Sequence, residues 1–294
     1  MSFKTILKKS FLYPYVKRLK QSLDIARGRL HPIQLIETSN QYPLVRLGSK
    51  YGGWTFVDTE YLQGSTFISA GLGEDASFDV EFAKRYKAKA VMVDPTPRAI
   101  AHFDQILARV GGRKIRDYSA EGQQDVESYD LTDVSPTQLH LVEKALWNES
   151  KEIKFFQPTN LDHVSHSIVN FQNNYVQDTP FITVTATKLS TLIKDLELEP
   201  SDISLVKLDI EGAEIEVLQA MIEDGFLPRQ LLIEYDELIS PSKKGYDRVT
   251  SMNKLLKNQG YKLLHCDRPS NFLYLKPRPA TKKPTLSNSA ANRP

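Results

Sequence analysis

Short apolar runs alternate with amphipathic patterns of helical period along most of the chain. Runs with the length and composition of buried strands lie at 66–70, 90–93, 139–146, 153–156, 203–208, 230–235, 261–266 and 272–275. Helical patterns lie between them, at 76–86, 97–110 and 189–196, after Gly212, and at 249–259. Strands that alternate with helices indicate parallel crossover units. The pattern predicts an α/β fold with a doubly wound, mostly parallel, seven-stranded Rossmann-like sheet and an antiparallel C-terminal strand pair.

The pattern also divides the chain. Residues 1–62 are predicted to form a basic N-terminal helix and a hairpin, with strands between Leu44 and Val57 and Gly52-Gly53 near the turn. Residues 63–276 form the main domain, in which the polar stretches 113–138 and 157–180 are predicted loops. Residues 277–294 lack apolar anchors, so we expect a disordered tail.

Residues 1–30 contain eight Lys and Arg and one acid, and their apolar positions have helical spacing interrupted by Pro14. This pattern fits an edge helix with a solvated basic face. The alternative is weak contact with a membrane surface.

Composition limits the class of protein. The 294 residues carry 38 basic and 36 acidic side chains, a net charge of +2, so no nucleic-acid partner is predicted. Cys266 is the single cysteine, which excludes an intrachain disulfide framework. Neither a run of roughly 20 apolar residues nor a secretory signal is visible. We therefore expect a cytoplasmic protein.

A glycine turn, Gly71-Leu72-Gly73, follows the first strand of the main domain, and Asp94 ends the next strand 21 positions after Gly73. This arrangement is general for nucleotide-binding crossovers, in which the acid at the end of the second strand forms hydrogen bonds with ribose hydroxyls. The acids Glu74, Asp75 and Asp79 crowd the helix start, where a dinucleotide would place its pyrophosphate. S-adenosylmethionine (SAM) has an ammonium and a sulfonium and no phosphate, so the turn favours SAM over NAD.

The stretch Val206–Met221 contains the most informative motif. The buried strand 203–208 ends at Asp209, and Glu211, Gly212 and Glu214 lead into a helix. Since ligands bind at the carboxyl edge of such sheets, Asp209 and Glu211 are candidates for catalysis. Glu234 and Asp236 end the neighbouring strand. Four acids at one edge also suit a divalent cation, but we predict no metal, because strand-end acids are common in nucleotide-binding folds.

These motifs together resemble the FkbM-type methyltransferases, from about Phe67 to Leu275. The resemblance is carried by the turn Ser69 to Asp79, by Asp94-Pro-Thr-Pro97, by Ala145-Leu146-Trp147, and by Lys-x-Asp-x-Glu-Gly-x-Glu at 207–214. Two positions depart from the pattern, since Ser69 replaces an acid and Asp75 a glycine. The resemblance implies a SAM-dependent methyltransferase domain, with O-methylation of a sugar hydroxyl in a glycan or of a secondary metabolite.

The predicted site follows from these motifs. The cofactor-binding candidates are Ser69, Gly71, Gly73, Glu74, Asp75, Asp79, Asp94, Pro95, Ala145, Leu146 and Asp209. The catalytic candidates are Asp209, Glu211 and His166, the last from the polar loop that also holds His163. The partner is a small-molecule or glycan acceptor. Two alternatives remain open: an NAD-dependent oxidoreductase or epimerase, and a non-catalytic methyltransferase-like binding protein.

Overall fold

The computed structural model describes residues 42–158, 166–169, 177–239 and 242–277, together with Val16, Leu19 and Leu23. The predicted tail from residue 278, His163, and the rest of the predicted N-terminal helix lie outside the described residues. Val16, Leu19 and Leu23 are helical, and their side chains are exposed. Among the described residues, no helix has the length and hydropathy that crossing a membrane requires.

A seven-stranded sheet forms the centre of the molecule, in the order β11-β12-β10-β9-β3-β4-β5. Its strands are Thr66–Ala70 (β3), Lys89–Val93 (β4), Leu139–Val142 (β5), Ile203–Leu208 (β9), Gln230–Glu234 (β10), Lys262–Asp267 (β11) and Asn271–Leu275 (β12). The order runs outward in both directions from the adjacent strands β3 and β9. The carboxyl ends of these two strands therefore form the topological switch point, where such sheets bind ligands.

The sheet is largely parallel, as predicted, and the expected antiparallel C-terminal pair is matched in part. Strands β10, β9, β3, β4 and β5 are joined by parallel pairings. β12 runs antiparallel to both of its neighbours, β10 and β11. Because β11 is antiparallel to an antiparallel strand, it points in the same direction as β10. Only β12 is reversed in the sheet.

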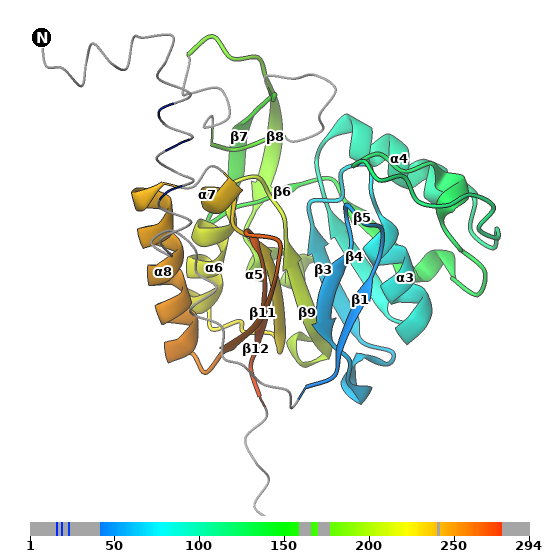
Figure 1. The fold of residues 1–294 in the computed structure, drawn as a ribbon. Helices are drawn as coiled ribbons and strands as arrows, with labels where there is room; N and C mark the ends of the chain where they lie inside the picture. Colours follow the sequence, from blue (N-terminus) through cyan, green and yellow to red (C-terminus); the bar gives the residue numbers. More distant parts are fainter. Residues whose placement is uncertain are drawn as a thin grey trace, which may run out of the picture.

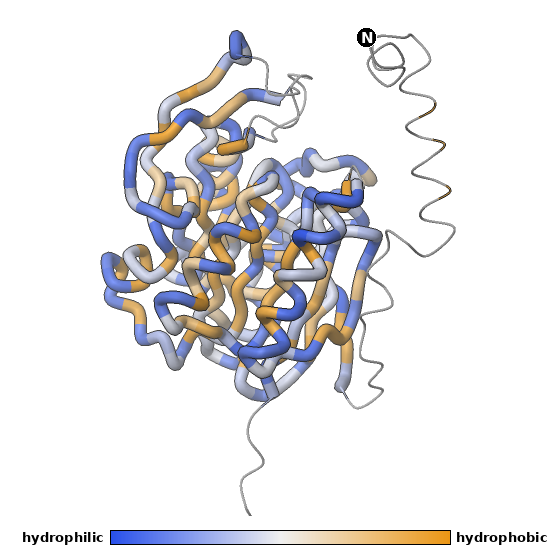
Figure 2. The backbone as a smooth tube through the Cα atoms, turned by 90° about the vertical axis from the view of Figure 1, so that its left-hand side faces the viewer, coloured by the Kyte–Doolittle hydropathy of each residue, from blue (hydrophilic) through white to orange (hydrophobic). Residues whose placement is uncertain are grey.

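Helices cover both faces of this sheet (Figure 1). Ser77–Tyr86 (α3) and Pro97–Ala108 (α4) lie on one side, and Leu189–Asp195 (α5), Glu214–Glu223 (α6) and Lys243–Asn258 (α8) on the other. Each side has its own apolar core. The apolar residues are concentrated in the strands and the inner faces of the helices (Figure 2). α8 begins six residues before the predicted helix, and the short α7 (Asp236–Ile239) was not predicted.

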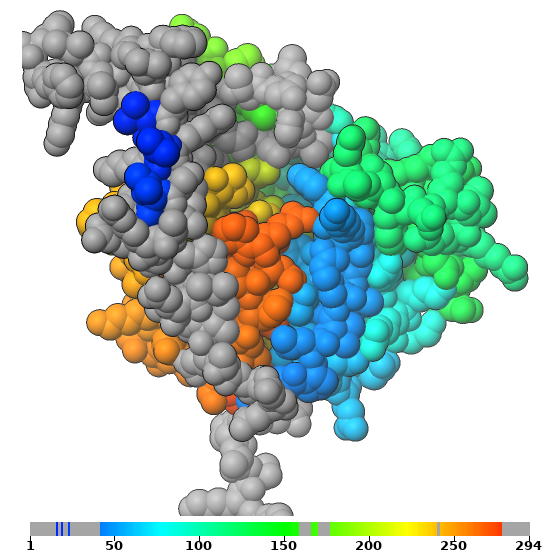
Figure 3. Space-filling model, viewed as in Figure 1, coloured from blue at the N-terminus to red at the C-terminus, as the bar shows by residue number. Residues whose placement is uncertain are grey.

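The predicted hairpin is present as Leu44–Leu47 (β1) and Trp54–Val57 (β2), which pair antiparallel. It lies beside the C-terminal strands on the face that Figure 3 shows. The Gln230 amide accepts from the Val57 amide N–H and donates to its carbonyl, at 2.8 and 2.9 Å. Asp267 accepts from the Thr55 amide N–H at 3.1 Å. The N-terminal hairpin is thereby attached to the far end of the chain.

An aromatic cluster fixes this hairpin to α3. Phe56 packs on Phe78, Phe82 and Tyr86 with ring centroids 5.2–6.0 Å apart, and Phe67 of β3 lies 4.5 Å from Phe82. All five rings are almost fully buried. Burying each large apolar side chain contributes roughly 1.5–3 kcal/mol relative to exposure. The hairpin is therefore part of the folded body, and its turn is held over the carboxyl edge of the sheet.

A second sheet was missed in part by the sequence pattern. Ala145–Leu146 (β6), Lys151–Phe156 (β7) and Phe181–Thr187 (β8) form a three-stranded sheet in the order β6-β8-β7. The predicted run 139–146 is two strands in two sheets, and 153–156 does not join the main sheet. No element was predicted at 181–187, where threonines alternate with apolar residues and only three of seven residues are buried. A strand with a mostly solvated surface lacks the apolar run on which the prediction relied.

The stretch 113–138 is mostly irregular, as predicted, but it is not an isolated loop. It contains two 3₁₀ turns, Val126–Ser128 and Pro136–Gln138, and places Tyr129 and Leu131 in the core. Through these two residues the stretch 113–138 packs against α3 and α4.

Two further 3₁₀ turns lie outside this stretch. Glu60–Leu62 precedes β3, and Pro200–Asp202 precedes β9.

Candidate functional site

A pocket opens at the switch point, between the carboxyl ends of β3, β4 and β9, with an empty volume of about 830 Å³ that is partly open to solvent. Most of the predicted site residues line it: Gly71, Gly73, Glu74, Asp75, Asp94, Pro95, Ala145, Leu146, His166, Asp209 and Glu211. The fold thus brings together residues that are up to 140 positions apart in the sequence. Their individual roles remain predictions.

Several lining residues were not predicted: Tyr51, Gly52, Leu72, Val93, Thr96, Gly122, Phe155, Lys207 and others. Tyr51 and Gly52 belong to the turn of the hairpin, and Gly122 to the stretch 113–138. A Cβ at Gly122 would lie 2.6 Å from the Tyr51 ring, so this glycine allows the ring to pack there. The glycine pair at 52–53 was the available sequence indication, since it predicted the turn of the hairpin.

Asp94 holds the glycine turn in place. Its Oδ2 accepts from the amide N–H groups of Leu72 and Gly73, each at 3.0 Å. Its Oδ1 accepts from the Thr96 amide and hydroxyl at 2.9 and 2.6 Å. Thr96 is the N-cap residue of α4, but its hydroxyl donates to Asp94 and it makes no side-chain cap. Asp94 is a turn-organising residue as well as a pocket-lining acid.

Asp75, which replaces the glycine of the family pattern, joins three segments. Its Oδ2 accepts from the Ser49 hydroxyl at 2.6 Å and from the Gln124 amide at 3.0 Å, and its Oδ1 accepts from the Ser77 amide. Gly52 passes so close that a Cβ there would lie 2.6 Å from the Asp75 carboxyl carbon. The acid thereby connects the hairpin turn and the stretch 113–138 to the start of α3.

Glu74 is paired rather than free. It forms an ion pair with Arg98 at the start of α4, and its side chain is 13% exposed. The Gln123 amide also donates to it, at 3.3 Å. Because Arg98 compensates its charge, Glu74 contributes less negative potential to the pocket than the sequence suggested.

Two predicted cofactor-binding residues, Ser69 and Asp79, do not line the pocket. Both are almost fully buried behind its wall, Ser69 in β3 and Asp79 in the first turn of α3. Lys207 of β9 also extends there, donating to the Gly71 carbonyl at 2.7 Å with its ammonium 5.9 Å from the Trp54 ring centroid. Burial raises the pKa of Asp79, and Lys207 and Ser69 partly offset that rise. Ser69, Asp79 and Lys207 therefore form a buried polar group beneath the glycine turn, to which Lys207 is hydrogen-bonded.

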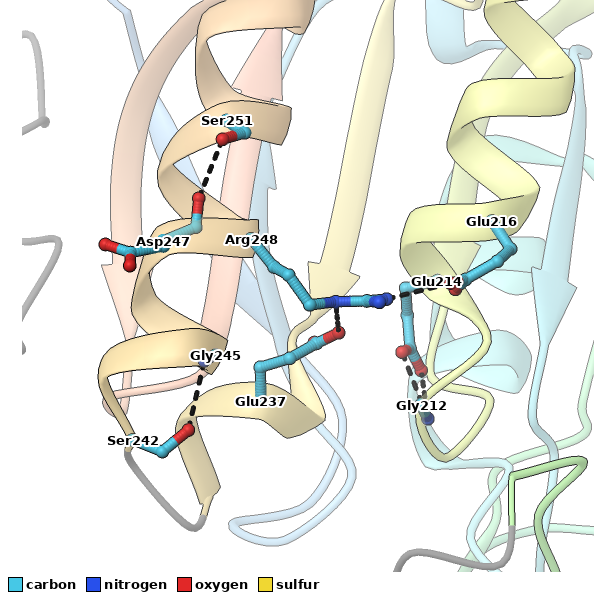
Figure 4. A network of polar contacts seen from close by, with 9 residues as sticks. All are labelled: Gly212, Glu214, Glu216, Glu237, Ser242, Gly245, Asp247, Arg248 and Ser251. Atoms are coloured by element: carbon cyan, nitrogen blue, oxygen red, sulfur yellow. Dashed lines mark hydrogen bonds and ion pairs between the residues drawn. The ribbon is translucent and has the colours of Figure 1, made fainter.

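The turn between β9 and α6 has a strained backbone that Glu214 stabilises. Glu211 and Gly212 both adopt positive φ, at 55° and 95°. The buried Glu214 carboxyl group accepts from the amide N–H group of Ile210, and from that of Gly212 as Figure 4 shows. A non-glycine residue at positive φ costs free energy and persists where its surroundings fix it. Glu214 therefore closes the turn that presents Asp209 and Glu211 to the pocket.

Acidic side chains gather around Asp209. Burial, followed by the charge of Asp209 and a hydrogen bond to it, raises the pKa of Glu234 to about 8. Burial and the surrounding carboxylates raise the pKa of Asp236 far above its usual range. Among the described residues, no group of three or more His, Cys, Asp or Glu side chains is arranged to hold a metal ion.

The other side of the pocket is aromatic and apolar. Phe155 of β7 stacks on His166, with centroids 5.9 Å apart and planes 22° from parallel. Ile168 and Leu146 continue this wall. The second sheet therefore contributes Phe155 and Leu146 to an aromatic and apolar part of the pocket lining.

Comparisons with known proteins identify the family. Residues 68–263 match the family model described as the methyltransferase FkbM domain. No curated protein and no solved structure matches the chain. The matched residues begin in β3, end in β11 and include every predicted site residue. The chain therefore belongs to the FkbM methyltransferase family, and its pocket at the switch point, with the acidic motif at the pocket floor, agrees with that membership.

Proposed function

We propose that this chain is a SAM-dependent O-methyltransferase that acts on a sugar hydroxyl of a glycan or on a secondary metabolite. Family membership supports methyl transfer. The observation that carries the choice of cofactor is the charge of the pocket. Its described lining contains five carboxylates and a single Lys or Arg, Lys207, which donates to the Gly71 carbonyl.

This charge suits SAM and disfavours a dinucleotide. SAM has two cationic groups beside one carboxylate, so an excess of acids attracts it. A pyrophosphate would lie at the start of α3, beside Glu74 and Asp75, where like charges repel. The nearby cation Arg98 is paired with Glu74. In the described lining, NAD would therefore find no Lys or Arg for its phosphates apart from Lys207, which donates to the Gly71 carbonyl.

The residues present fit the parts of SAM. Asp94 lines the pocket and accepts four hydrogen bonds, which occupy its four lone-pair sites, so a ribose hydroxyl would bind it by replacing the rotatable Thr96 hydroxyl. The apolar wall at Ala145 and Leu146 suits the adenine ring. Bound SAM would supply a methyl group on a sulfonium, a leaving group that is already activated.

Asp209 is the group proposed to act on the acceptor. It follows β9 directly, lines the pocket and is half-buried. In the methyl transfer that bound SAM would support, the Asp209 carboxylate would accept the proton of the acceptor hydroxyl. Glu211 and His166 are the alternative bases. Phe155 and His166 supply a flat surface against which a sugar or an aromatic acceptor can lie.

Binding and turnover test this proposal separately. Calorimetry of the purified chain with SAM and with NAD should give binding to SAM alone, and binding to NAD alone would refute the cofactor. Incubation with methyl-labelled SAM and a glycan or metabolite extract should then label a product at oxygen. SAM binding without any labelled product across such extracts would favour the non-catalytic alternative.

A further inference from the structure

Glu234 and Asp209 are brought together by the register of two parallel strands. Ile233 of β10 pairs with Leu208 of β9, so Glu234, the last residue of β10, lies beside Asp209, which follows β9. After burial, Asp209 is the largest cause of the raised pKa of Glu234, through its charge and a side-chain hydrogen bond. Two adjacent carboxyl groups form such a hydrogen bond only when one of them carries a proton, because two ionised carboxylates repel.

The surroundings of this pair determine where the proton resides. Ser270, which precedes β12, donates to Glu234 Oε1 at 3.0 Å. The other charged or titratable groups that act on this edge include Glu211, Glu214 and Asp236, with Tyr51 and Arg268 from the loops above. Arg268 donates to the carbonyls of Lys50 and Tyr51. Burial and the neighbouring acids raise the pKa of Glu234 to about 8, so Glu234 holds its proton at neutral pH.

We propose that Glu234 is a positioning residue for methyl transfer, which fixes the Asp209 carboxylate through a donated hydrogen bond and leaves the remaining Asp209 lone pairs to the acceptor. This inference rests on the proposed function, since it concerns the orientation of the base in the same site. A protonated Glu234 also explains how a second acid can lie beside Asp209 without doubling the negative charge at the switch point. Asp209 then accepts the acceptor proton while Glu234 keeps its own.

Two substitutions at Glu234 separate positioning from a merely structural role. Glu234→Gln keeps a neutral donor at the same place and cannot titrate. We expect it to retain kcat within about threefold of the wild type at pH 7, and to lose the change in rate that the wild type shows near pH 8. Glu234→Ala removes the donor and should lower kcat by about tenfold or more, with the affinity for SAM within about threefold of the wild type.

Glu223→Gln is the matched control, because Glu223 is an exposed glutamate at the end of α6 and its change also removes one negative charge. It should leave both the rate and its pH profile unchanged. Equal losses in Glu234→Gln and Glu234→Ala would show that Glu234 acts as an ionised group, which overturns the inference. An unchanged rate in Glu234→Ala would overturn it as well.

A readout without SAM or acceptor distinguishes this inference from the proposed function. In ¹³C-carboxyl NMR of glutamate-labelled protein, the signal that disappears in Glu234→Gln should titrate with a midpoint near 8. Asp209→Ala should move that midpoint toward the ordinary range. A midpoint near the ordinary value in the wild type would refute the pairing even if methyl transfer were observed. If SAM failed to bind, the proposed function would fail while this titration still reported the pair.

Discussion

The backbone carbonyl oxygen of Asp209 lies 1.7 Å from the position that a Cβ atom at Gly71 would occupy. The two residues follow the adjacent strands β9 and β3, and the Asp209 amide N–H donates to the carbonyl of Ala70 at 3.1 Å. Gly71 also has a φ of +84°. The close approach of the two strand ends, which forms the floor of the pocket, is therefore possible only with glycine at this position.

Gly71→Ala should strongly destabilise the protein and abolish SAM binding, because a backbone carbonyl cannot move aside without breaking the sheet edge. We expect a loss of more than about 2 kcal/mol, since left-handed strain alone costs about 1–2 kcal/mol. Gly64→Ala is the control, because Gly64 also has a positive φ, +65°, but no atom lies within 4 Å of the position that a Cβ would occupy there. Denaturant unfolding measures both variants. Equal losses would show that strain alone, and not the contact with Asp209, requires Gly71.

Asp94→Ala should weaken SAM binding by at least about tenfold and also lower the melting temperature. Loss of the carboxylate removes hydrogen bonds to a charged group, worth about 1.5–3 kcal/mol each, and leaves the Leu72 and Gly73 amide N–H groups without their acceptor. Calorimetry and thermal melting measure the two effects. Asp104→Ala, on the exposed face of α4, should change neither. An Asp94 variant with wild-type affinity would remove this residue from the cofactor site.

Asp209→Asn should keep SAM affinity near the wild type while the methylation rate falls by about 10²-fold or more, the usual range for loss of a general base. The amide keeps the size of the side chain but cannot take a proton. Asp202→Asn, an exposed change before the other end of β9, is the control. Lost SAM affinity would instead place Asp209 in the cofactor site, with Glu211 or His166 as the base. Unchanged turnover would rule out its catalytic role.

The stability of the ligand-free protein should depend on pH through Glu234. Its pKa is raised to about 8 in the folded chain and lies near 4.3 when unfolded. Its contribution is therefore fully present below about pH 4 and is lost as the pH rises through about 8. Thermal melting from pH 5 to 9 should show a smaller decrease for Glu234→Gln than for the wild type. Parallel curves would contradict the raised pKa.

Arg248 should prove important for the packing of α6, α7 and α8. It donates to Glu216 at 2.8 Å and to Glu237 at 3.0 Å, and lies between them in Figure 4. The second carboxylate oxygen of each glutamate is buried without a partner among the described residues. Arg248→Met leaves two poorly solvated acids and should cost about 1–3 kcal/mol in denaturant unfolding.

Lys243→Met provides the comparison for this change. Its ammonium lies 2.7 Å from Asp247, but its side chain is 87% exposed, so the loss should be below about 0.5 kcal/mol. Similar losses in the two variants would show that the Arg248 contacts are as weak as an ordinary surface pair.

The sequence by itself determined the elements whose period is local and strong. The strands 66–70 and 203–208 were predicted at their observed ends, because apolar runs and flanking turn residues define a buried strand without reference to the rest of the chain. The order of glycines and acids after those strands also indicated the edge at which the pocket lies. The parallel sheet and the choice of the carboxyl edge followed from the same pattern.

Tertiary structure alone decided how the side chains at that edge are used. Asp75 and Asp79 are similar in sequence, yet one lines the pocket and joins three segments while the other is buried behind it. The strand 181–187 forms because β6 and β7 supply its partners, since its half-solvated pattern carries little information of its own. The pairing of Glu234 with Asp209 depends on the register between two strands whose paired residues are 25 positions apart, which no local pattern encodes. Hydrogen bonds, burial and charge pairing act between neighbours in space, so the roles of these residues were decided only when the chain folded.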